Sequence, residues 1–196
     1  MNKHTTREAW LTAAVELLRP LFREQDATIP KKVRASCGWP GAGSINKCVG
    51  ECWNTNCSEG SYAEVFISPV LAEPLAVLDT LVHEIVHAVV GLEAKHGKVF
   101  GTLARAVGLV GKMPSSEAGE ELQVKLLAMS KKLGSYPHSI LRPGKRLKGK
   151  PNCRLLKAAC PKCGYVVRVT RKWLDEAGAP ICPTCGIAFE EETKEE

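Results

Sequence analysis

Apolar residues recur at intervals of three and four near the start of the chain, over residues 6–24. This spacing places them on one face of an amphipathic helix. Strands are expected next at 32–37, 47–53 and 63–68, the first two on either side of a glycine-rich turn. The helical apolar positions are Trp10, Leu11, Ala14, Leu17, Leu18 and Leu21.

Residues 75–92 are mostly apolar and contain neither proline nor glycine before Gly91. Such a run predicts a buried helix, and Gly91 is a natural place for it to end. Further helices are expected from His96 or Gly97 to Val107 and, after Pro114, over 116–133. A helix, a small sheet and then several helices in this order predict an α+β domain.

Three of the five histidines fall within residues 83–96. His83 and His87 lie one turn apart on the predicted apolar helix, so both imidazoles can bind one metal ion. Glu84 follows the first histidine directly and is placed to take a proton from a zinc-activated water. His96 comes just past the helix end, where the chain can fold back to supply a third ligand.

A chance match is the alternative, because HExxH occurs in many helices and a lone histidine on an apolar face is usually a core residue. An apolar helix has no reason to bury two histidines and a glutamate unless something pairs them, since unpaired buried charge is costly. We therefore predict a catalytic zinc ion bound by His83, His87 and His96, with Glu84 as the general base.

Four cysteines form two matching CPxCG knuckles near the C-terminus. Each knuckle directs two thiolates at one point, so Cys160, Cys163, Cys182 and Cys185 predict a closed tetrahedral site for a structural zinc ion. The residues between the knuckles alternate as a strand does over 165–170. The segment is therefore expected to be a zinc ribbon that needs its ion to fold.

The remaining cysteines have irregular spacings. Cys37, Cys48, Cys52 and Cys57 could form a third metal site, but burial of small hydrophobic thiols in a sheet is the favoured interpretation. Cys153 precedes the first knuckle and could replace one of its ligands, although we treat it as spare.

The segments HEIVHA and HGKVF, followed by the four-cysteine ribbon, resemble the SprT-like zinc metallopeptidase family, which includes the Spartan proteases. The similarity covers about residues 60–188 and is greatest to the small bacterial and phage members. The metzincin pattern HExxHxxGxxH is not met, because Val90 and Glu93 replace its glycine and last histidine. The expected segments are a zincin-like metallopeptidase domain (1–140), a basic linker (141–152), a zinc ribbon (153–189) and a disordered acidic tail (190–196).

The net charge of +6 is unevenly distributed. Residues 131–172 contain no Asp or Glu, whereas the tail 190–196 is acidic and could compete with DNA for the basic surface. Charge runs are usually solvated surface, but this one favours DNA, single-stranded or junction-containing, with Tyr165 and Trp173 stacking on unpaired bases. The predicted DNA contacts are Lys145, Arg146, Lys148, Lys150, Arg168, Arg171 and Lys172.

No apolar run reaches the roughly 18 residues that span a bilayer, and the N-terminus lacks the layout of a secretion signal. A cytoplasmic protein without a membrane partner is therefore expected. In a reducing compartment, nine cysteines indicate bound metal rather than disulfides.

The combined prediction is a zinc metalloendopeptidase that cleaves proteins bound or crosslinked to DNA, the substrate class that the SprT-like resemblance implies. Asp79 could orient a metal ligand, and Tyr136 or His138 could stabilise the developing oxyanion. One alternative is a non-catalytic, zinc-dependent nucleic-acid-binding or transcription-associated protein, and another is a cytosolic peptidase whose ribbon only contacts proteins. The intact Glu84 favours an enzyme, because a structural site needs the ligands but not the base.

Overall fold

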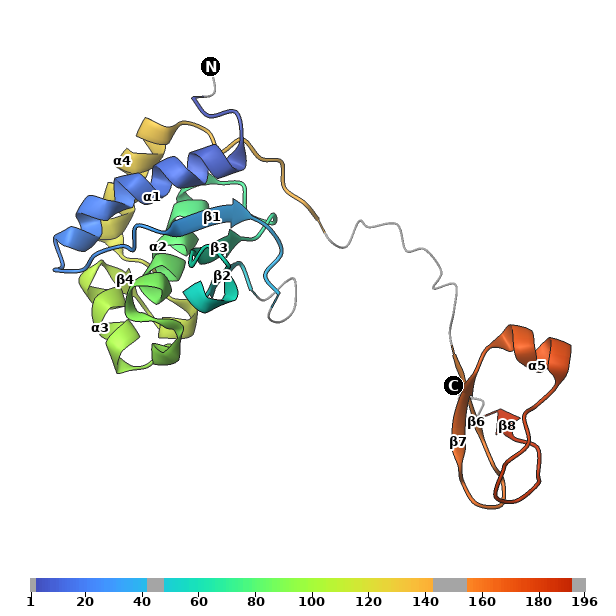
Figure 1. Cartoon of the computed structure of the whole chain (residues 1–196). Coiled ribbons are helices and arrows are strands. Elements are labelled where there is room, and N and C mark those ends of the chain that lie inside the picture. The colour runs from blue at the N-terminus through green and yellow to red at the C-terminus, as the bar shows by residue number, and fades with distance from the viewer. Residues whose placement is uncertain (1–2, 42–47, 143–154, 192–196) are drawn as a thin grey trace. The chain divides into compact units, whose positions relative to one another are not determined.

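A computed structural model describes residues 3–41, 48–142 and 155–191 (Figure 1). Contacts divide the chain into two compact units, Met1–Lys145 and Arg146–Glu196, and each is described by itself. Helices and small sheets occur together, so the predicted α+β class is confirmed. Within the described ranges, no helix is both long and apolar enough to cross a membrane.

The first unit begins with the predicted amphipathic helix, α1 (Arg7–Arg23). Thr6 caps it, because its hydroxyl accepts a hydrogen bond from the backbone N–H of Ala9. The apolar face of α1 is buried, and the indole N–H of Trp10 donates to the carbonyl of Gly134 at 3.1 Å. This bond ties the N-terminal helix to the end of the last helix of the unit.

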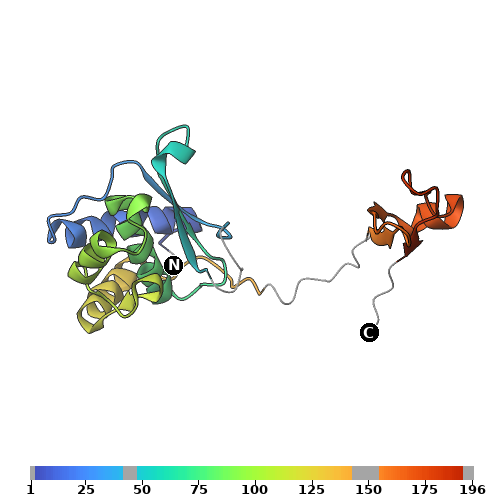
Figure 2. The same ribbon diagram turned by 90° about the horizontal axis from the view of Figure 1, so that it is seen from below.

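The three predicted strands form one sheet, with β1 (Val33–Cys37), β3 (Ala63–Ile67) and β2 (Gly50–Trp53) in the order β1-β3-β2. β3 is parallel to β1 and antiparallel to β2. The inward residues Ala35 and Val65 belong to the same core as the helices, so the helices cover one face of this sheet (Figure 2). The strand order leaves β2 at a sheet edge.

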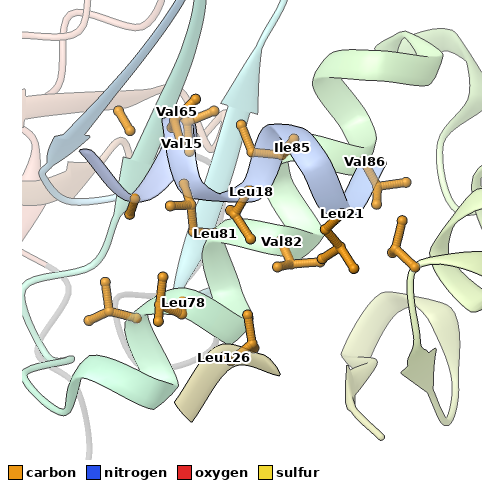
Figure 3. Close-up of a cluster of buried hydrophobic side chains, with 14 of the residues drawn as sticks. Val15, Leu18, Leu21, Val65, Leu78, Leu81, Val82, Ile85, Val86 and Leu126 are labelled. Carbon is orange, nitrogen blue, oxygen red and sulfur yellow. The ribbon is translucent and has the colours of Figure 1, made fainter. Parts of the chain in front are cut away.

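The long apolar helix is α2 (Pro74–Val90), as predicted. Pro74 occupies its first turn, where a missing N–H costs nothing, and Gly91 ends it with a φ of 86°. Side chains of α2 pack against α1, β3 and the last helix (Figure 3). Burial on several sides explains why the apolar run is nearly continuous. The α2 residues labelled in this core are Leu78, Leu81, Val82, Ile85 and Val86.

The helix expected over 116–133 is shorter than predicted. After α3 (Lys98–Ala106), the chain forms a two-stranded pair, β4 (Leu109–Val110) and β5 (Glu117–Ala118), and only then α4 (Glu120–Leu133). Gly119 directly precedes α4, and a glycine inside a helix costs about 1 kcal/mol relative to alanine. The pairing of β4 with β5 sets the course of the chain just before α4.

The second unit contains a three-stranded sheet in the order β7-β6-β8, made of β6 (Leu156–Ala159), β7 (Val166–Val169) and β8 (Glu190–Glu191). A short helix that was not predicted, α5 (Arg171–Ala177), follows β7. Because β8 pairs with β6, the disorder expected from residue 190 does not hold for the first two residues of that tail. Residues 192–196 lie outside the described ranges.

Candidate active site

Three imidazole nitrogens converge beside the second half of α2. His83 and His87 lie on α2, and the loop after η2 (Leu92–Ala94) brings His96 back to them. His96 Nε2 lies 3.1 Å from His83 Nε2 and 3.2 Å from His87 Nε2. The predicted trio is therefore a group that could hold a metal ion, with ligand atoms all within 4.8 Å of one another.

The spacing of these nitrogens suits ligands of one metal ion better than it suits hydrogen bonds between the three rings. Two ligands bound at 2.0–2.1 Å in a tetrahedral zinc site are about 3.3 Å apart, close to the spacings of His96 Nε2. That atom meets two other ring nitrogens, and a single N–H proton cannot satisfy both. Burial, together with the neighbouring histidines, lowers the pKa of His83 and His87 to about 4. Both rings are thus neutral at pH 7, the form that binds metal.

A hydroxyl group from outside α2 holds the ring of His83. Ser116 Oγ lies 2.9 Å from His83 Nδ1, which leaves Nε2 facing the other two histidines. Asp79, which was expected to orient a ligand, instead accepts a hydrogen bond from the backbone N–H of Ala118. Its Oδ1 is buried without a partner among the described residues, and burial raises the pKa of this carboxyl to about 6.

Glu84 is the buried acid of the site, with only 7% of its surface exposed. Burial, and to a lesser extent the negative charge of Glu51, raise the pKa of Glu84 to about 8. Its carboxylate lies directly against β2. A Cβ atom added at Gly50 would come within 2.5 Å of Glu84 Oε1 and 2.6 Å of Thr80 Cγ2. The absence of a side chain at Gly50 therefore allows the strand to pack on the base.

A Gly50→Ala substitution is expected to separate β2 from α2 and displace Glu84. Overpacking of this kind typically costs about 1–3 kcal/mol, which urea denaturation would measure as a lower midpoint. Gly41→Ala is the matched control, because a Cβ there would meet Trp53 and Glu51 no closer than 3.5 Å. Equal stability of the two variants would contradict the close approach at Gly50.

A cleft of about 500 Å³ contains the three histidines and Glu84. One wall is the chain from Cys48 to Cys52, which includes most of the edge strand β2, and another is the segment 114–117. Five consecutive residues, 48–52, line this wall, and an extended chain lying along them would match them residue for residue. The described lining of the cleft contains no Lys or Arg. It includes the carboxyl groups of Glu51, Asp79, Glu84 and Glu117.

The two candidates for oxyanion stabilisation lie outside this cleft. His138 Nε2 is 2.8 Å from the carbonyl oxygen of Pro69, and its Nδ1 is 3.3 Å from Arg7 Nη1. Tyr136 packs against Trp10, with ring centroids 5.0 Å apart. The chain after α4 turns toward the N-terminus of α1, so the expectation that either side chain serves the reacting centre is wrong.

The four ribbon cysteines form the second group that could hold a metal ion, with their sulfur atoms within 4.8 Å of one another. In the first knuckle, the Cys160 N–H donates to the Tyr165 carbonyl and the Gly164 N–H donates to the Cys160 carbonyl, both at 2.9 Å. The second knuckle repeats this pattern from Cys182 to Ile187. Backbone N–H groups, that of Cys163 first, lower the pKa of Cys160 to about 7, which favours its thiolate, whereas the neighbouring Cys163 raises the pKa of Cys185.

The earlier cysteines do not form a third metal group among the described residues. Cys52 is buried in β2 and Cys37 and Cys48 are half-buried, in line with the expected burial of thiols in or beside the sheet. Cys57 is the exception, because it is exposed in the short helix η1 (Thr55–Cys57). Cys153 lies outside the described ranges.

Three of the predicted DNA contacts are described. Arg168 is exposed on β7, and Arg171 and Lys172 occupy the first turn of α5. Lys172 Nζ lies 5.1 Å from the ring centre of Trp173, while Arg171 Nη2 lies 2.5 Å from an oxygen of Glu191. The other four predicted contacts lie outside the described ranges: Lys145, Arg146, Lys148 and Lys150.

Comparisons with protein-family models, with curated proteins and with solved structures find no match to this chain. A functional conclusion therefore depends on the arrangement of the chain's own residues. In that arrangement, three histidines and one buried glutamate share a cleft, and four cysteines form a separate cluster.

Proposed function

We propose that the chain is a zinc metallopeptidase of the SprT-like type that cleaves proteins bound or crosslinked to DNA. The observation that carries this proposal is the meeting of three imidazoles and a buried carboxyl group, Glu84, in one cleft. A three-histidine site that only stabilised the fold would not need a buried acid beside it. The resemblance of HEIVH, HGKVF and the ribbon to SprT-like peptidases supports the same activity.

His83, His87 and His96 would hold the ion, and three protein ligands leave a coordination position open. Zinc bound there would supply Lewis-acid chemistry, polarising a carbonyl group and acidifying water. Glu84 ionises more readily beside a dication, which counteracts the burial that raises its pKa. The Glu84 carboxylate can then accept a proton from water and return it to the leaving amine. Ser116 keeps His83 in the required orientation.

The position of β2 supports a polypeptide substrate. β3 pairs with one side of β2, and within the described ranges no strand pairs with the other. An extended peptide can add to such an edge through main-chain hydrogen bonds. Because β2 forms a wall of the cleft, a scissile amide in the added strand would lie beside the histidines.

The ribbon surface supports the proposed association with DNA. The cations Arg168, Arg171 and Lys172 suit phosphate groups, and Tyr165 and Trp173 expose 50% and 58% of their surface for stacking on unpaired bases. Binding to the same strand would raise the local concentration of a DNA-bound substrate around the peptidase. That effect needs no fixed contact between the two units.

Glu84→Gln is the variant that tests the proposed catalysis. Glutamine keeps the size of the side chain but cannot accept the proton, so we expect cleavage of an unfolded protein substrate to slow by about 10²–10⁴-fold. Zinc content should be equal in the two proteins, and Glu121→Gln on the exposed side of α4 is the matched control. Cleavage at the wild-type rate by Glu84→Gln would refute the assignment of the base.

A further inference from the structure

A second hollow, of about 190 Å³, adjoins the metal cleft where β2 ends. Cys52, His87 and Leu92 line both spaces, so the two share a wall. Side chains of an extended chain alternate in direction. A peptide paired with β2, with a carbonyl group at the histidines, would therefore direct a neighbouring side chain into this hollow.

The lining of the hollow suits a long basic side chain. Glu93 is its one charged residue within the described ranges, and a carboxylate forms short, charge-assisted hydrogen bonds with ammonium and guanidinium groups. The aliphatic stem of such a side chain can lie against the apolar part of the lining. Ala63 and Ala88 contribute only methyl groups, which leaves room for such a stem.

The carboxylate of Glu93 is exposed to solvent and is oriented by a neighbouring side chain. Asn54 Nδ2 donates a hydrogen bond to Glu93 Oε1 at 3.0 Å, which connects η1 to η2. Glu93 Oε2 lies over Gly91, where an added Cβ would approach it to 2.8 Å. Glu93 fills the place of the last histidine in the metzincin pattern, yet it does not belong to the metal-binding group. Its carboxylate therefore remains available to a ligand at the hollow.

The charge of the adjoining cleft favours the same ligand. Its described lining includes four carboxyl groups and no Lys or Arg, although the chain as a whole has a net charge of +6. With no Lys or Arg in its described lining, the cleft does not repel a cationic side chain. DNA-binding proteins carry many Lys and Arg residues, so a basic segment is common in the substrates proposed for this chain.

We propose that the hollow is a substrate side-chain pocket that selects lysine or arginine, and that Glu93 determines this specificity. The inference rests on the proposed peptidase function and names the class of peptide that the site prefers. Asn54 is the positioning residue for Glu93.

The test uses full-length, zinc-loaded protein and a set of peptides that differ at one position. A lysine is moved through the positions on both sides of the scissile bond, and each peptide has a partner with norleucine, which keeps the stem but lacks the charge. At one position we expect kcat/KM to be about tenfold higher for lysine than for norleucine. Glu93→Gln, which preserves the bond to Asn54, should reduce the lysine rate to the norleucine rate and leave the latter unchanged. Glu93→Lys should favour a glutamate peptide instead.

Two negative results are distinguishable. Cleavage that requires Glu84 but shows the same lysine-to-norleucine ratio in wild type and Glu93→Gln would overturn this inference and leave the peptidase intact. Absence of any Glu84-dependent cleavage by the wild type would overturn the proposed function and, with it, the inference of a specificity pocket. Glu121→Gln, an exposed acid outside both spaces, should keep the wild-type ratio, and the norleucine rate reports that each variant is folded.

Discussion

A His87→Ala variant is expected to lose the metal ion of the cleft and, with it, nearly all cleavage. His87 is buried, and its Nε2 lies 3.2 Å from that of His96, so its removal leaves one ligand on α2 and one in the loop. A catalytic zinc site requires three protein ligands. We expect zinc content to fall by about one ion per chain and the rate of protein cleavage to fall by about 10³-fold or more. Elemental analysis and a cleavage assay measure the two effects.

Two controls separate the loss of a ligand from a general loss of structure. Ser116→Ala removes only the hydroxyl beside His83, so metal affinity should weaken by about 10–100-fold while the protein still binds zinc at saturation. His4→Ala changes a histidine that does not line the cleft and should leave both measurements at the wild-type value. Full zinc content and full activity in His87→Ala would show that this histidine is not a ligand.

Cys182→Ser is expected to unfold the second unit while the first remains folded. Cys182 is fully buried, and among the described residues the core around it consists of Ala158, Cys160 and Phe189, with Val167 and Val169 partly buried against it. So small an apolar core cannot stabilise a fold alone, whereas structural zinc contributes about 10–16 kcal/mol of apparent binding free energy at pH 7 in zinc-finger peptides. Amide hydrogen exchange on the full chain should show protection lost in β6 and β7 and retained in α2.

Removal of zinc with a chelator should produce the same pattern as Cys182→Ser. Cys57→Ser is the matched control, since this exposed cysteine lies outside the four-sulfur group. It should leave exchange in both units unchanged. Protection of β6 and β7 that survives both the chelator and Cys182→Ser would mean that the second unit folds without a metal ion.

Local sequence patterns were sufficient to predict the helices that are determined by the spacing of apolar residues and by glycine stops. α1 and α2 followed from apolar spacing, and Gly91 ends α2 because the chain there takes a positive φ. The helix expected over 116–133 ends where predicted but begins later, at Glu120, because Gly119 is a stronger break than Pro114. α5 was missed although its signals, a Thr170 cap and a Gly178 stop, are present in the sequence.

In the candidate site, too, residues close in the sequence could be predicted and residues brought together by the fold could not. His83, Glu84 and His87 share one helix, so their proximity could be read from their spacing, and His96 follows within a short loop. Ser116 could not be identified, because the pairing of β4 with β5 brings it to α2 from a distant part of the chain.

The roles of Gly50, Asn54 and Glu93 likewise could not be predicted from the sequence, because they depend on tertiary contacts. Gly50 is needed because β2 packs directly on Glu84. Glu93 lines the second hollow and accepts a hydrogen bond from Asn54, which lies far from it in the sequence. The converse holds for Tyr136 and His138, which were considered because of their residue types and which pack near α1 instead.

The central claim is that a zinc peptidase acts on proteins held on DNA, and one cleavage assay tests it most directly. Zinc-loaded full-length protein is incubated with a DNA-binding protein, with and without single-stranded DNA, beside a Glu84→Gln variant of equal zinc content. A third protein carries Arg168→Gln, Arg171→Gln and Lys172→Gln together. We predict that DNA accelerates cleavage by the wild type, that the triple variant loses the acceleration, and that Glu84→Gln cleaves about 10²–10⁴-fold more slowly than the wild type. Absence of cleavage by the wild type in both conditions, while wild type and Glu84→Gln bind DNA equally, would contradict the claim and identify a zinc-dependent DNA-binding protein instead.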